Sequence, residues 1–252
     1  MSIKPPNKLK NIKVLIFDLD GTLYVPEKEF SDRMYYINVE ILSRDLHISL
    51  GEAEKLFEEK KKEYPSKTRL LADLTGRSII ELMKETEAVK ESHYFHRDPK
   101  LIRMFNLLTN RLDPGDKHIK THQPLVLDPG DHYIKQHHKT FRLFILCNGY
   151  SDFVLMQLRE LGLDPKIFEE IITADVTGTT KPSLEPFKHI LTKTMLAPEK
   201  HLMIGDRSKV DLDPARKLGM KTCLLKTPWN EEKREGYDIL LDTIYDLPKY
   251  LL

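Results

Sequence analysis

The sequence has few cysteines, no long apolar run and no excess of charge of either sign. Its two cysteines, Cys147 and Cys223, lie in separate apolar stretches and form neither a disulfide framework nor a CxxC zinc motif. No apolar run approaches the roughly 20 residues that a membrane-spanning helix needs. Lysine and arginine total 40 against 39 aspartates and glutamates, which argues against a nucleic-acid or membrane-surface binder. The N-terminal MSIKPPNKLKN has no apolar stretch behind its lysines, so we expect a cytoplasmic protein with reduced thiols.

Five short apolar runs are typical of buried strands, and segments with helical periodicity separate most of them. The runs are Lys13–Phe17, Leu143–Cys147, Glu170–Ala174, His201–Ile204 and Lys221–Leu225. Continuous apolar runs that alternate with amphipathic segments predict a parallel sheet covered on both faces. Right-handed crossovers then give a doubly wound, Rossmann-like α/β fold. Ligands in such folds bind at the carboxyl ends of the strands.

Residues 26–97 differ from the rest because we expect them to be entirely helical. Apolar side chains recur there at helical spacing, at Phe30, Met34, Ile37 and Ile41. Ser49 and Glu52 form a possible capping box, and the pair Asp98-Pro99 is typical of a helix start. A helical block inserted after the first strand predicts a cap over an active site. A helical subdomain unrelated to catalysis is the alternative interpretation.

We therefore expect a core formed by residues 1–25 and 98–252, with the helical cap between them. The core carries a short duplication at Leu112–His138, where LDPGDKHIKTH is followed by LDPGDHYIKQH. Each Asp-Pro-Gly-Asp is a turn signal. The repetition itself explains why five histidines gather in this segment, and a metal site is the alternative. We expect a protruding arm that packs on the core or on another subunit.

The stretch KVLIFDLDGTLY carries the clearest chemical signal. A buried strand ends in two carboxylates, Asp18 and Asp20, followed by Gly21. An aspartate can attack phosphorus as a nucleophile, and a second carboxyl group can protonate the leaving oxygen and later activate water. A plain acidic turn is the alternative. A calcium loop is less consistent with the sequence, because no glutamate follows at the required spacing.

Two further segments place charged side chains after predicted strands or before a helix. In HLMIGDRSKVD, a short apolar run leads into Asp206, and Asp211 follows five residues later. Carboxylate oxygens suit magnesium, which neutralises charge on a transferring phosphoryl group. Lys181 precedes a predicted helix and could hold a phosphate there.

Taken in order, these pieces resemble the haloacid dehalogenase-like hydrolase superfamily. The segment Asp18–Thr22 looks like its first motif, Leu143–Gly149 occupies the place of the second, Lys181 matches the third, and Asp206 with Asp211 the fourth. The resemblance implies a Rossmann-like core with a helical cap, a Mg²⁺ cofactor and an aspartyl-phosphate intermediate.

The same resemblance implies a role for each charged residue. Asp18 is expected to be the nucleophile and a metal ligand. Asp20 is expected to be the acid/base and to lend its backbone carbonyl to the metal. Lys181 then steadies the phosphate, Asp206 binds the metal and Asp211 supports the metal site.

The second motif departs from the family pattern. Where the family has serine or threonine at the strand end, this chain has Cys147, followed by Asn148. A thiol is a weaker hydrogen-bond donor than a hydroxyl. The resemblance places Cys147, Asn148 and Thr22 around the phosphoryl group, and the exchange at Cys147 leaves a weakened phosphatase-like binding protein as one alternative.

The leading hypothesis is magnesium-dependent hydrolysis of a small phosphorylated metabolite. Asp20 argues against a dehalogenase, because that branch lacks the second aspartate and needs no metal. The sequence CNGYSDFVLMQLRELGL and the helical cap resemble the pyrimidine 5′-nucleotidase-like branch, which suggests a nucleoside 5′-monophosphate; a sugar phosphomutase is the alternative enzyme. Polar candidates for substrate contact near turns of the cap are Tyr24, Tyr64, Lys67, Arg69 and Arg77.

Overall fold

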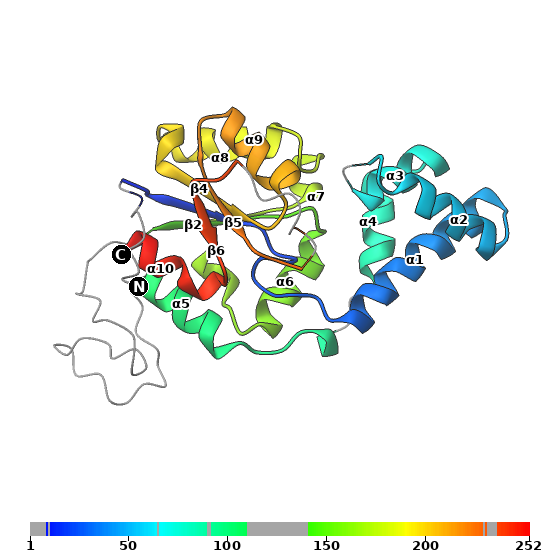
Figure 1. Ribbon diagram of the computed structural model, residues 1–252, viewed down its shortest axis with the longest axis horizontal. Helices are drawn as coiled ribbons and strands as arrows, with labels where there is room; N and C mark the ends of the chain where they lie inside the picture. Colours follow the sequence, from blue (N-terminus) through cyan, green and yellow to red (C-terminus); the bar gives the residue numbers. More distant parts are fainter. Residues whose placement is uncertain are drawn as a thin grey trace, which may run out of the picture.

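A six-stranded parallel sheet lies at the centre of the molecule. The computed structural model describes residues 9, 11–64, 66–89, 92–109, 141–228, 230 and 236–252. The strand order is β3-β2-β1-β4-β5-β6, which confirms the predicted doubly wound α/β fold (Figure 1). The strands are β1 (Val14–Phe17), β2 (Arg142–Leu146), β3 (Glu170–Ile172), β4 (His201–Gly205), β5 (Lys221–Leu225) and β6 (Ile239–Leu241).

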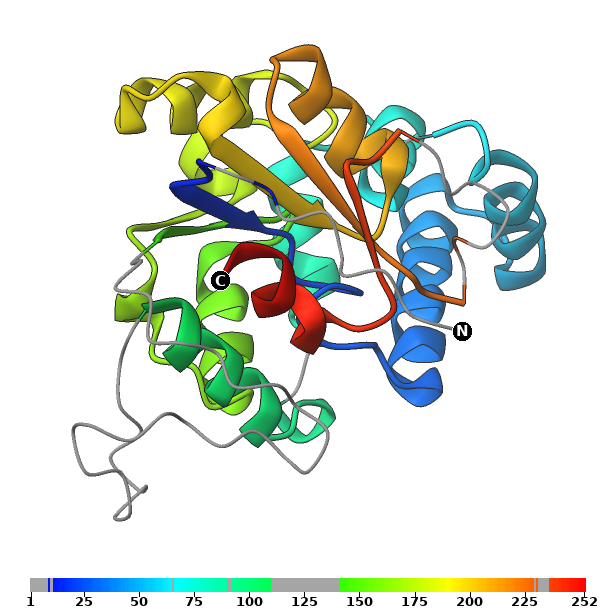
Figure 2. The same cartoon turned by 60° about the vertical axis from the view of Figure 1, so that its left-hand side comes forward.

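Helices cover both faces of this sheet (Figures 1 and 2). One face carries α8 (Glu185–Thr194) and α9 (Asp213–Lys217), and the other carries α5 (Pro99–Thr109), α6 (Ser151–Glu160) and α10 (Leu247–Leu251). The short helix α7 (Ala174–Thr177) follows β3. Shorter helical turns lie at Pro165–Ile167, Pro198–Lys200, Ser208–Leu212 and Ile244–Asp246.

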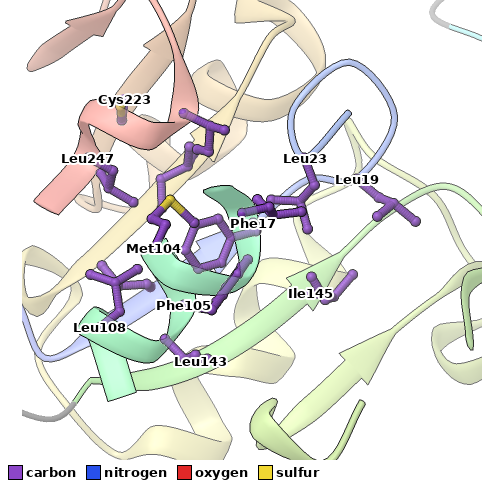
Figure 3. Close-up of a cluster of buried hydrophobic side chains, with 14 of the residues drawn as sticks. Phe17, Leu19, Leu23, Met104, Phe105, Leu108, Leu143, Ile145, Cys223 and Leu247 are labelled. Carbon is purple, nitrogen blue, oxygen red and sulfur yellow. The ribbon is translucent and has the colours of Figure 1, made fainter. Parts of the chain in front are cut away.

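The apolar run of β1 serves both faces of the sheet at once. Successive strand side chains point to opposite faces. Leu15 and Phe17 accordingly lie in the larger apolar core with α5, whereas Val14 and Ile16 lie in the core with α8. Figure 3 shows Phe105 of α5 against Phe17, with ring centroids 5.1 Å apart. The strand is therefore packed on both faces, and Asp18 directly follows it.

Four helices form a separate block beside the sheet (Figure 1). They are α1 (Lys28–Leu46), α2 (Leu50–Lys60), α3 (Lys67–Thr75) and α4 (Ile79–Glu87), and the 3₁₀ turn Ser92–Tyr94 leads back toward the sheet. The block has its own apolar core, made by Val39, Ile41, Leu42, Ala53, Phe57, Leu70, Leu71 and Leu82. Among the described residues, none of the helices is both long and apolar enough to cross a bilayer.

Side chains define several of the helix starts. The capping box predicted for α2 is present, because the Ser49 hydroxyl accepts from the Glu52 amide while the Glu52 carboxylate accepts from the Ser49 amide. Asp98 accepts hydrogen bonds from the amides of Lys100 and Leu101, so the predicted start of α5 is also confirmed. These local contacts satisfy amide groups that have no partner within the helix.

The structure differs from the sequence-based expectation at two strands. The predicted strand Glu170–Ala174 ends at Ile172, because Ala174 already belongs to α7. The edge strand β6 was not predicted, since its three residues stand alone between two aspartates. The duplicated segment Leu112–His138 lies outside the described residues.

Candidate active site

Two buried aspartates meet at the carboxyl edge of the sheet. Asp18 follows β1 and Asp206 follows β4, and these strands are neighbours with Phe17 paired to Ile204. The Asp18 amide donates to the Ile204 carbonyl at 2.9 Å. Only 2% of Asp18 and 1% of Asp206 is exposed. The chain reverses its direction of winding between β1 and β4, the place where open α/β sheets bind ligands.

The turn after β1 folds back onto the first aspartate. Gly21 has a φ of 85°, a conformation that glycine adopts without steric cost, and its amide donates to the Tyr24 carbonyl at 2.9 Å. The turn brings the Thr22 hydroxyl within 3.3 Å of Asp18 Oδ2, to which it donates a hydrogen bond. Thr22 therefore contacts the predicted nucleophile directly.

Lys181 is fully buried between two carboxylates. Its Nζ donates to Asp18 Oδ1 at 2.6 Å and to Asp211 Oδ1 at 2.7 Å. Burial alone would lower the pKa of Lys181, but the two negative charges outweigh it and raise that pKa. Burial raises the pKa of Asp18, and attraction to the ammonium group opposes this rise. The lysine therefore carries a positive charge that offsets the clustered carboxylates.

The chain after β2 holds the lysine loop in place. The Asn148 side chain donates to the Lys181 carbonyl at 2.9 Å and accepts from the Lys181 amide at 2.7 Å. These two hydrogen bonds use the side-chain amide of Asn148, which the family resemblance places near the phosphoryl group. Asn148 also lines the pocket described below. Cys147 is buried beside them. Burial raises the pKa of its thiol, and the negative charges of Asp20 and Asp18 also act to raise it.

Asp211 lies on a short helical turn after β4. Its Oδ2 accepts from the Arg207 amide at 3.0 Å, and a Cβ at position 205 would come within 2.6 Å of its side chain. Glycine at position 205 thus permits this close approach. Since Lys181 engages the other oxygen, Asp211 is better placed to orient its neighbours than to act alone on a ligand.

Three carboxylates form a possible metal site. Asp18, Asp206 and Asp211 are all buried, and one oxygen from each lies within 4.8 Å of the others. Oxygen donors of this kind are those that Mg²⁺ prefers, with waters completing its octahedral shell. Arg207 lies beside them, its Nε 3.9 Å from Asp206 Oδ1. The donor set fits a divalent cation such as Mg²⁺.

The Asp20 side chain makes its hydrogen bonds outside this cluster of carboxylates. Its Oδ1 accepts hydrogen bonds from the Tyr24 hydroxyl and, at 3.0 Å, from Gln157 Nε2 of α6. Among the described residues, the carboxylates that could hold a metal ion together are those of Asp18, Asp206 and Asp211, and the Asp20 carboxylate is not one of them. Asp20 nevertheless lines the same pocket as Asp206.

A pocket of about 380 Å³ lies between this edge of the sheet and the helical block. Its wall from the sheet side includes Asp20, Gly21, Asn148, Asp206 and Arg207, and its wall from the helical block includes Phe30, Met34, Asn38, Ser66, Lys67, Thr68, Thr86 and Glu87. Among the polar candidates from the cap, Lys67 lines the pocket and Tyr24 contacts Asp20. Arg77 instead pairs with Asp45 and Glu85.

Sequence reasoning missed three residues of the site. Gln157 is a buried polar side chain on an otherwise apolar helix face with Val154 and Leu158, and that break in the pattern was its only signal. Arg207 directly follows Asp206, so its position in the chain was a signal. Asn230 donates to the Asp206 carbonyl at 2.8 Å from a loop after β5, and its sequence context gave no sign of this contact.

Comparison with known proteins relates this geometry to one family. The family model for haloacid dehalogenase-like hydrolases matches residues 12–219. A protein of Methanocaldococcus jannaschii named glyceraldehyde 3-phosphate phosphatase is 27% identical over 247 residues, which covers 94% of this chain and 95% of the relative. A Pyrococcus furiosus protein of the same name is 37% identical over 96 residues, or 38% of this chain and 40% of its own.

Solved structures share the fold. A structure titled as a HAD phosphatase from Thermococcus onnurineus has a TM-score of 0.61 and 20% identity, covering 94% of this chain and 97% of the other. A putative beta-phosphoglucomutase from Thermotoga maritima has a TM-score of 0.57 and 17% identity, covering 96% and 100%. At these identities the likeness concerns the fold alone.

Proposed function

The chain belongs to the haloacid dehalogenase-like hydrolases, and from that membership we propose that it is a phosphatase that hydrolyses small phosphate monoesters through Asp18. The observation that carries the proposal is the buried contact of Asp18 with Lys181, beside Asp206 and in reach of a pocket that Asp20 also lines. A carboxylate held this way has a neighbouring cation to offset negative charge and an adjacent space for an ester.

The proposed reaction has two displacements. An Asp18 oxygen attacks phosphorus, the bond from phosphorus to the ester oxygen breaks, and Asp20 gives that oxygen a proton. Water then attacks the phosphorus of the aspartyl phosphate, the bond from phosphorus to the Asp18 oxygen breaks, and Asp20 takes up one proton of the water. The products are the alcohol and inorganic phosphate, and both aspartates return to their starting state.

The acidic cluster is proposed to hold Mg²⁺. Asp18 and Asp206 would contribute carboxylate oxygens, Asp20 its backbone carbonyl, and Asp211 would support the site through its contacts with Lys181 and the Arg207 amide. A bound magnesium ion neutralises charge on the phosphoryl group. Lys181 donates a hydrogen bond to Asp18 Oδ1 and Thr22 donates one to Asp18 Oδ2, and the two bonds orient the carboxylate for attack.

The substrate is proposed to be a small phosphorylated metabolite, with glyceraldehyde 3-phosphate as the first compound to test. The name of the relative that spans nearly the whole chain supports this choice. A pocket of about 380 Å³ is within the usual range for small-molecule sites. Nucleoside 5′-monophosphates form the second group to test, because the segment after β2 resembles a nucleotidase-like branch.

A phosphate-release assay tests the proposal. The purified chain would be incubated with Mg²⁺ and a panel of triose, sugar and nucleoside monophosphates. We expect phosphate release that is lost after chelation and in Asp18→Asn, and retained in Asp73→Asn, an exposed aspartate of α3 that serves as the matched control. No release from any ester, or an unchanged rate in Asp18→Asn, would contradict the proposal. Transfer of phosphate between sugar positions without release would indicate a phosphomutase.

A further inference from the structure

A buried glutamine and a tyrosine hold one oxygen of Asp20. Gln157 Nε2 donates to Asp20 Oδ1 at 3.0 Å and to the Tyr24 hydroxyl oxygen at 2.8 Å, while the Tyr24 hydroxyl donates to the same Oδ1. The three side chains come from the turn after β1 and from α6. We propose that Gln157 and Tyr24 are positioning residues that fix the Asp20 carboxylate for proton transfer to the leaving oxygen, an inference that rests on the proposed function.

The burial of Gln157 supports a dedicated role. Its side chain is fully buried on a helix face whose neighbours, Val154 and Leu158, belong to the apolar core. Its Oε1 has no hydrogen-bond partner among the described residues. Burying an amide with half of its hydrogen-bonding capacity unmet is unfavourable compared with an apolar side chain of similar size. The donor end, which reaches Asp20 and Tyr24, is therefore the reason for an amide at this position.

Tyr24 provides a second donor that does not change with pH in the working range. Burial raises the pKa of its hydroxyl well above the ordinary value, and the nearby charge of Asp20 raises it further. The phenol therefore keeps its proton. Its ring packs edge-on against Phe95, with centroids 5.2 Å apart, which limits rotation of the side chain. The donor thus has a fixed direction.

Two donors that converge on Oδ1 restrict how the Asp20 carboxylate can rotate. Proton transfer depends on close and well-aligned contact with the reacting oxygen, so loosening this carboxylate should slow protonation of the leaving group. An alkoxide leaving group needs that proton, whereas 4-nitrophenolate leaves readily without it. The arrangement therefore makes a prediction that depends on the substrate, which a purely structural role would not.

The experiment compares kcat/KM for an alkyl phosphate and for 4-nitrophenyl phosphate in Tyr24→Phe and Gln157→Met. This ratio reports steps up to formation of the phosphoenzyme, so water attack does not obscure the effect. We expect a fall of about 10-fold to 100-fold for the alkyl ester and of less than about 3-fold for the aryl ester. The double variant should lose less than the product of the two single losses, because both residues act on one oxygen.

Matched controls separate positioning from packing. Tyr250→Phe removes a hydroxyl on α10, away from the contacts that hold Asp20, and Leu158→Met changes an apolar neighbour of Gln157 on the same helix; both should leave the two ratios unchanged. Equal losses on both esters in Tyr24→Phe, which preserves the ring, would overturn the inference, as would no loss on the alkyl ester. The alkyl ester is one that the phosphate-release panel shows to be a substrate; wild-type protein that releases phosphate from no ester of that panel would instead overturn the proposed function, on which this inference rests.

Discussion

Lys181 and its two carboxylates form a buried charged group in which each member depends on the others. Removing one partner of a buried ion pair leaves an uncompensated charge in the interior. We predict that Lys181→Met lowers the free energy of unfolding by about 3–5 kcal/mol, measured by urea denaturation in chelator. Adding Asp211→Asn should recover part of the loss, because it removes one of the two unpaired charges.

An exposed lysine provides the control for this prediction. Lys188 contacts Glu185 at 2.8 Å on the surface of α8. Exposed pairs contribute about 0–1 kcal/mol, so Lys188→Met should have little effect on the midpoint of unfolding. A similar loss in the two methionine variants would contradict the importance assigned to the buried lysine.

Cys147 stands where a hydroxyl is expected, and its substitution tests that position. Burial raises the pKa of its thiol, so the sulfur stays protonated and serves only as a weak donor. We predict that Cys147→Ser keeps kcat/KM unchanged or raises it by up to about 100-fold, the scale of one good donor to a developing charge. Cys223→Ser, in the apolar core, should cost stability without changing turnover. A hundredfold fall in folded Cys147→Ser would show that the position has another role.

Much of the candidate site could be predicted from the sequence, because its aspartates directly follow predicted strands and the ends of neighbouring strands lie side by side. Asp18 and Asp206 follow adjacent strands, so their meeting follows from the sheet order. Lys181 was expected near them, but its contact with Asp211 was not. Gln157 and Asn230 reach the site from separate parts of the chain, and such contacts depend on three-dimensional packing that a local pattern does not encode.

At the level of elements, the start of α3 contributes a cation to the pocket. Lys67 lies in the wall opposite the sheet, where its ammonium group can meet a phosphate. We predict that Lys67→Met raises KM for a phosphorylated metabolite by about 5-fold to 20-fold with a smaller change in kcat. Lys55→Met, at an exposed position of α2, is the control. An unchanged KM in Lys67→Met would argue against α3 as part of the substrate site.

The elements themselves were predictable where the sequence pattern is long or carries specific caps. The apolar run before Asp18 and the Ser49 capping box identified β1 and the start of α2. The edge strand β6 has only three residues, with little periodicity to detect. Ala174 begins a helix although it continues an apolar run, because composition alone does not locate the end of a strand.

At the scale of the whole molecule, a hydrogen bond beside the pocket links the helical block to the core. Glu87 at the end of α4 accepts a hydrogen bond at 2.8 Å from the Tyr150 amide, at the start of α6. A carboxylate at a helix start is favourable because the first amides there carry partial positive charge. This contact ties the block to the loop that also carries Cys147 and Asn148.

The duplicated segment is predicted to be remote from the chemistry. The chain leaves α5 at Thr109 and enters β2 at Arg142, at the edge of the sheet opposite Asp18. We predict that replacing Leu112–His138 with a short loop leaves kcat/KM within about twofold, as expected for a change away from the site, and alters oligomeric state or solubility as measured by light scattering. A folded, monodisperse protein that loses turnover or selectivity would contradict this topological argument.

The central claim is that Asp18 accepts the phosphoryl group, and trapping of the phosphoenzyme tests it most directly. Asp20→Asn should be treated with 4-nitrophenyl phosphate, whose leaving group departs without a proton, then quenched in acid and mapped by mass spectrometry. Because Asp20 is the proposed base for water attack, we predict that a hydroxylamine-sensitive phosphoryl group accumulates on Asp18 and is absent from the double variant with Asp18→Asn. A phosphoryl group on another residue, or continued hydrolysis by the double variant, would contradict the account.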